Sequence, residues 1–162
     1  MLDTNWIENT MAWRKERECD PVPFITGPLL DNAYFLYGKV GELFDAAHKH
    51  ILALAGTSYK RNPQSTKGAI ADEIGDVFMM LATVAGQADI MHCKQIHHFK
   101  FDNPLLCIRD LSFYVGLVCT QIENNYRFDL NYVYSLALDI AKMFDIDPGE
   151  ALAGALRKIE AR

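Results

Sequence analysis

Long apolar runs are missing from this sequence. No segment reaches about 18 uninterrupted apolar residues, the length at which a membrane-spanning helix is expected. The first residues contain neither a basic region nor an apolar stretch, so they do not resemble a secretory signal. The four cysteines form no C-x-x-C pair, which indicates free thiols in a reducing compartment. We therefore expect a soluble, cytoplasmic protein without a membrane partner.

Positive charge is also scarce. Lys and Arg total 16 against 21 Asp and Glu, so the formal net charge is −5. Such a chain has no general attraction for nucleic-acid backbones or anionic membranes. The sequence also lacks the P-loop, the G-x-G-x-x-G loop, the nucleophile elbow and the H-E-x-x-H motif. Any enzymatic activity must therefore come from a different arrangement of residues.

Helical periodicity dominates what is present. No segment alternates apolar and polar residues over a useful length, whereas apolar residues recur at spacings of three and four. We expect one all-α domain over residues 1–162, with helices at about 4–18, 28–56, 65–91, 104–125, 129–144 and 147–162. Long amphipathic helices joined by short loops predict an antiparallel bundle. Its wide apolar faces predict completion by oligomerisation, as a homodimer or homotetramer.

One predicted helix carries an unusual acidic residue. Residues 74–85 are apolar around most of the helix circumference, which predicts burial, yet Asp76 lies among them, one turn after Glu73. The nearest Lys or Arg along the chain is Lys67. Because a buried, unpaired carboxylate is strongly unfavourable, such a group is usually paired, protonated or bound to metal. A divalent cation is the simplest candidate.

A second acidic pair lies on the preceding helix. Glu42 and Asp45 have the same spacing of three as Glu73 and Asp76, so each pair projects from one helix face. If the two helices form an antiparallel hairpin, four carboxylates converge, and such oxygen ligands suit Mg²⁺ or Mn²⁺. The alternative for Glu42 and Asp45 is a plain solvated face, because they lie opposite the apolar stripe.

These residues carry a family resemblance. Val40-Gly41-Glu42-Leu43-Phe44-Asp45-Ala46, followed by Asp72-Glu73-Ile74-Gly75-Asp76-Val77, resembles the E-x-x-E…E-x-x-D signature of MazG-like all-α NTP pyrophosphohydrolases. The resemblance implies a core motif hairpin at residues 28–91, closing helices at 129–162 and an apparent insertion at about 92–128. Aligned on V-G-E-L, Lys39 stands where the family has its leading glutamate, so Asp45 would supply the missing carboxylate.

The resemblance implies a function and a set of site residues. A nucleoside triphosphate would be hydrolysed to the monophosphate and pyrophosphate with Mg²⁺ or Mn²⁺, with Glu42 or Glu73 as general base. The metal ligands would be Glu42, Asp45, Glu73 and Asp76. Candidate substrate contacts are Lys39, Lys60, Arg61, Lys67, Lys158 and Arg162 for phosphate, and Trp13 and Asn32 for the base.

Other functions stay open at this point. The chain is alternatively a non-catalytic helical interaction module that has lost activity, or a dUTP- or phosphoribosyl-ATP-type pyrophosphatase. A zinc site at Cys93 and His97 is a weaker alternative, based on their spacing of four on a helix.

Overall fold

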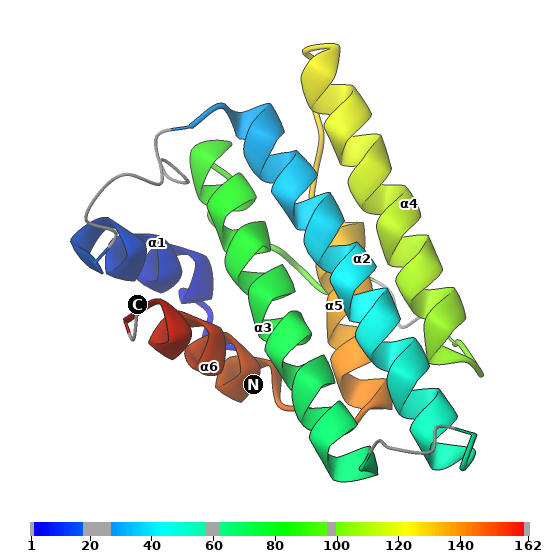
Figure 1. Cartoon of the computed structure of the whole chain (residues 1–162). Helices are drawn as coiled ribbons and strands as arrows, with labels where there is room; N and C mark the ends of the chain where they lie inside the picture. Colours follow the sequence, from blue (N-terminus) through cyan, green and yellow to red (C-terminus); the bar gives the residue numbers. More distant parts are fainter. Residues whose placement is uncertain (1, 18–26, 58–61, 97–99, 161–162) are drawn as a thin grey trace.

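The computed structural model describes residues 2–17, 27–57, 62–96 and 100–160, and within these ranges every regular element is a helix (Figure 1). The six helices are α1 (Trp6–Arg17), α2 (Leu29–Leu54), α3 (Pro63–Gln87), α4 (Pro104–Glu123), α5 (Asn131–Met143) and α6 (Pro148–Glu160). The all-α fold expected from the periodicity is confirmed.

The helices α2 and α3 form the central antiparallel hairpin (Figure 1). On the far side of α2 lies α4, and α5 packs against both α4 and α3. On the far side of α3 lie α1 and α6, which both contact it. The hairpin that carries the two acidic motifs is therefore surrounded by the other helices on several sides.

The apolar run of α3 is buried as predicted. Every residue from Val77 to Ala85 is buried, and so are Ile74 and Gly75. The helix meets neighbours on most of its circumference, which matches its sequence because an all-round apolar helix needs cover on all faces. Asp76 interrupts the run on the side that faces α2, and its side chain is 21% exposed.

Two helices begin at an Asn-Pro pair. The Asn62 side chain accepts a hydrogen bond from Gln64 N at 2.9 Å, and the Asn103 side chain accepts one from Leu105 N at 2.9 Å. In both cases the proline occupies the first helical turn, where its missing N–H is harmless. The helix α3 begins at Pro63, two residues before the expected start near residue 65, because Asn62 caps it.

Close packing of α3 on α6 depends on one glycine. A Cβ added at Gly75 would lie 2.2 Å from the backbone oxygen of Ala151, which is far inside van der Waals contact. Glycine therefore allows the two helix backbones to approach each other here. This contact holds α6 against the same helix that carries Glu73 and Asp76.

Several large apolar side chains remain exposed on α2 and α4. Phe113 is 66% exposed and Leu117 43% exposed on α4, and Tyr34 and Phe35 are each about half exposed on α2. Within the described residues, α4 is the one helix long and apolar enough, by length and composition, to cross a membrane. A core helix of a soluble protein passes the same test, and α4 packs against α2 and α5.

Candidate metal centre between α2 and α3

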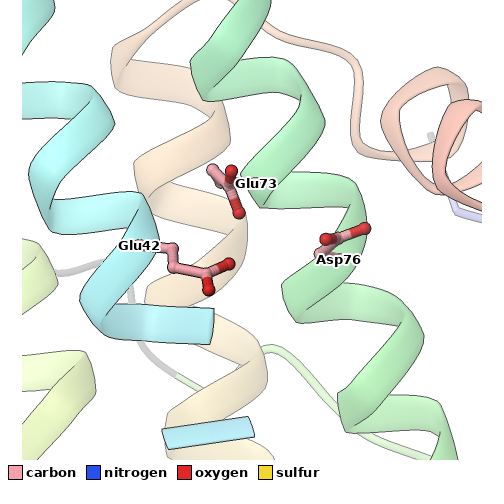
Figure 2. A group of neighbouring side chains, drawn as sticks. All are labelled: Glu42, Glu73 and Asp76. Carbon is pink, nitrogen blue, oxygen red and sulfur yellow. The ribbon is translucent and has the colours of Figure 1, made fainter. Parts of the chain in front are cut away.

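Three of the four predicted carboxylates converge. Glu42 projects from α2 toward α3, while Glu73 and Asp76 project from successive turns of α3 (Figure 2). One carboxylate oxygen from each of the three residues lies within 4.8 Å of the others. The antiparallel hairpin therefore produces the convergence that the two acidic motifs predicted for these three residues.

A lysine is part of the same group. Lys39 Nζ lies 2.6 Å from Glu42 Oε2 and 2.9 Å from Asp76 Oδ2, so its ammonium joins α2 to α3. Burial would lower the pKa of Lys39, but its hydrogen bonds to Glu42 and Asp76 outweigh that effect and raise the pKa above its ordinary value. No Lys or Arg lies near Asp76 along α3, and the positive charge beside it comes from Lys39 on α2.

Glu73 is the least satisfied member of the group. Its Oε2 is buried and has no hydrogen-bond partner among the described residues. Burial raises the pKa of Glu73 to about 7; the positive charge of Lys39 opposes this rise, and the negative charges of Asp76 and Glu42 add to it. The hydrogen bond from Lys39 instead lowers the pKa of Glu42. The two glutamates therefore differ in their affinity for protons.

Asp45 lies outside the group of three. Its side chain is exposed and pairs with Lys49, one turn further along α2. Both residues line a surface hollow of about 460 Å³, together with Glu42, Glu73 and Gly41. A Cβ at Gly41 would meet nothing within 4 Å, so packing does not require this glycine, and its effect is to leave the hollow open.

The cations expected to bind phosphate are partly engaged elsewhere. Lys158 on α6 pairs with Asp72 at 2.9 Å, and Lys67 lies 3.5 Å from Asp145. Lys39 is the predicted phosphate contact that the structure brings into direct contact with the carboxylates. Three others, Lys60, Arg61 and Arg162, lie outside the described residues.

The two residues expected to contact a base lie away from the carboxylates. Asn32 is buried, and it donates a hydrogen bond to Gln87 Oε1 at 2.8 Å near the opposite end of the hairpin. Trp13 is half-buried on α1. The next residue, Arg14, donates a hydrogen bond to Thr83 on the C-terminal half of α3. The hydrogen bonds of Asn32 and Arg14 therefore reach the C-terminal half of α3, beyond Glu73 and Asp76.

The zinc alternative loses its helical basis. Cys93 lies in the non-helical segment that follows α3, so a spacing of four does not place it on a helix face with a second ligand. Burial raises the pKa of the Cys93 thiol to about 12, with a smaller contribution from Asp129. A raised pKa disfavours the thiolate that binds zinc. His97 and His98 lie outside the described residues.

Sequence reasoning missed the part that Lys39 plays between the helices. The signal for half of it was present, because Lys39 precedes Glu42 by three residues, a spacing that places two side chains on one helix face. The contact with Asp76 depends on how the two helices pack.

No protein-family model matches this chain, and no curated protein or solved structure matches it significantly.

Proposed function

We propose that this chain is a metal-dependent nucleoside triphosphate pyrophosphohydrolase, which converts a (d)NTP and water to the (d)NMP and pyrophosphate. The observation that carries the proposal is the convergence of Glu42, Glu73 and Asp76 from two antiparallel helices. These are carboxylates of the E-x-x-D motif and of its upstream partner motif, on which the resemblance to MazG-like enzymes rests. The surface hollow beside them provides room for phosphates.

The chemistry of the donors fits a hard divalent cation. Three carboxylates within 4.8 Å of one another are oxygen ligands of the type that Mg²⁺ and Mn²⁺ prefer. The buried Glu73 Oε2, which lacks a hydrogen-bond donor, is an acceptor available to such an ion. Glu42, Glu73 and Asp76 would hold the metal, which when bound supplies polarisation of the phosphate oxygens.

The remaining steps fall to the side chains of this chain. Glu73 or Glu42 would take a proton from the attacking water, through a carboxylate oxygen that does not bind the metal. The water oxygen then bonds to the α-phosphorus, and the bond from that phosphorus to the bridging oxygen breaks to release pyrophosphate. Lys39, which contacts two of the carboxylates beside the hollow, would bind phosphate oxygens.

A nucleotide panel tests the proposal. Each NTP and dNTP, dUTP included, together with phosphoribosyl-ATP, is incubated with the protein and Mg²⁺, and both pyrophosphate and orthophosphate are measured. We expect pyrophosphate release that stops in excess chelator and falls at least about a hundredfold in Asp76→Asn. Asp45→Asn, which removes an exposed carboxylate outside the group of three, is the matched control and should keep most of the activity. Orthophosphate release, or full activity in chelator, contradicts the proposal.

The alternative is a non-catalytic helical module, and one observation favours it. Lys39 already forms ion pairs with two of the three carboxylates, Glu42 and Asp76. If that pairing is permanent, the group is a structural ion-pair cluster between α2 and α3. The same panel decides, because such a module would release no pyrophosphate from any of the nucleotides. Base preference, including a dUTP- or phosphoribosyl-ATP-type specificity, is also given by the panel.

We further propose that the chain forms a homodimer or a homotetramer. The support is the exposure of large apolar side chains on α2 and α4, namely Phe113, Leu117, Tyr34 and Phe35. Large apolar side chains exposed on a protein surface often mark an interface between chains. Light scattering at micromolar concentration should give at least twice the chain mass of 18.3 kDa. A monomeric mass would contradict this assembly.

A further inference from the structure

Lys39 contacts two of the three carboxylates that would hold a metal. Its Nζ lies 2.6 Å from Glu42 Oε2 and 2.9 Å from Asp76 Oδ2. These two carboxylates belong to the group of three whose oxygens lie within 4.8 Å of one another. The ammonium and a divalent cation would therefore compete for the same ligands.

Repulsion between positive charges disfavours binding of a divalent cation while the Lys39 ammonium stays between Glu42 and Asp76. An ammonium held between Glu42 and Asp76 would lie within a few ångströms of a cation bound by the same residues, and like charges at that separation repel each other. Lys39 is also only partly exposed, with 29% of its side chain accessible, so solvent screens the repulsion incompletely. Metal binding therefore requires Lys39 to leave at least one of its two partners.

A displaced Lys39 needs a new anion. The nearest other carboxylate on its helix, Asp45, is paired with Lys49. A lysine ammonium is a compact charge on a flexible stem of four carbons, which suits it to move from a carboxylate to a phosphate. The surface hollow beside the group borders Glu42 and Glu73, so a triphosphate there would lie within reach of such a side chain.

We propose that Lys39 couples the two ligands of this site: the divalent cation displaces its ammonium from the carboxylates, and the triphosphate binds the displaced ammonium. This inference rests on the proposed function, because it takes the divalent cation and the triphosphate as the ligands. The free cation then binds weakly by itself and more tightly when the triphosphate is present. By linkage, the cation strengthens triphosphate binding by the same factor.

The first measurement uses Mn²⁺ alone, with free Mn²⁺ followed by its paramagnetic resonance signal. Lys39→Met removes the competing charge at similar length, and we expect it to bind Mn²⁺ at least about tenfold more tightly than the wild type. Lys49→Met is the matched control, since it removes a lysine from the same helix and the same hollow. Its affinity should change by no more than about threefold, as expected for an exposed pair.

The second measurement uses inorganic tripolyphosphate, which avoids any dependence on base preference. Calorimetry gives its affinity in chelator and at saturating Mn²⁺, and the ratio of the two is the coupling factor. In the wild type this factor should exceed that of Lys39→Met by at least about fivefold. Lys39→Gln serves in both measurements if Lys39→Met does not show the wild-type circular dichroism.

The outcomes separate this inference from the proposed function. Equal or weaker Mn²⁺ binding by Lys39→Met overturns the inference, even if the protein hydrolyses nucleotides. Equal coupling factors, or no tripolyphosphate binding to either protein, overturn the part that concerns phosphate. Tighter Mn²⁺ binding and lost coupling, without pyrophosphate release from any nucleotide, support the inference and contradict the proposed function.

Discussion

The raised pKa of Glu73 predicts that the metal-free protein becomes less stable as pH rises. The pKa is about 7 in the folded protein against an ordinary value of 4.5, so the folded state binds more protons than the unfolded state between these values. The free energy of unfolding must then fall with rising pH through this window. Below pH 4.5 both states are protonated at Glu73, and its contribution is fully present.

The magnitude follows from the size of the shift. One pKa unit corresponds to about 1.4 kcal/mol, so a shift from 4.5 to about 7 has an upper limit of about 3.4 kcal/mol. Glu73 is only half-buried, and solvent screening reduces this limit to about 1 kcal/mol. For a chain of this length, such a loss lowers Tm by about 2–4 °C.

Urea unfolding in chelator at several pH values between 4.5 and 8 measures the effect. Glu73→Gln keeps the shape but cannot ionise, so its advantage over the wild type should grow with pH by about 1 kcal/mol across the window. Asp45→Asn is the control, because it removes an exposed carboxylate outside the group. If the difference between Glu73→Gln and the wild type is independent of pH, Glu73 is not held in the environment described here.

Four further substitutions test the packing and the site. Gly75→Ala should destabilise the protein by about 1–3 kcal/mol in urea unfolding, because its Cβ would collide with the backbone of Ala151. Gly68→Ala, in the same helix with nothing within 4 Å of its Cβ, should instead stabilise by about 0.5–1 kcal/mol, and the opposite order would contradict the packing of α3 on α6. Wild-type protein should gain about 2.7 kcal/mol in thermal melts at Mg²⁺ a hundredfold above Kd, and Asp76→Asn should lose most of this gain. An unchanged metal response in that variant would remove Asp76 from the metal site. Asn62→Ala should cost about 1 kcal/mol through loss of the α3 cap, and an unchanged urea midpoint would show that the cap contributes nothing.

The sequence predicted the hairpin and the acids that face each other across it. Apolar residues around the whole of α3 require burial, and the Asn103-Pro104 pair predicts the start of α4. Because α2 and α3 are antiparallel, contacts that move forward along α2 move backward along α3. The pairing of Lys39 with Asp76, and that of His50 with Thr66, follow this rule.

The details of the site depend on packing that the sequence does not specify. Residues 42 and 45 point about 60° apart around a helix, so the rotation of α2 decides which of them faces α3. Glu42 does, and Asp45 pairs with Lys49 at the surface. The partner of Asp76 lies on another helix, which a search along its own helix cannot find. Asn32 meets Gln87 because both lie at the same end of the hairpin.

The identity of the phosphorus-containing products tests the central claim most directly. Purified protein, Mg²⁺ and the best nucleotide of the panel are combined in oxygen-labelled water, and the products are followed by phosphorus NMR. The account predicts a nucleoside monophosphate and pyrophosphate in equal amounts, with the labelled oxygen in the monophosphate. Nucleoside diphosphate with orthophosphate, or no turnover of any nucleotide, would contradict it.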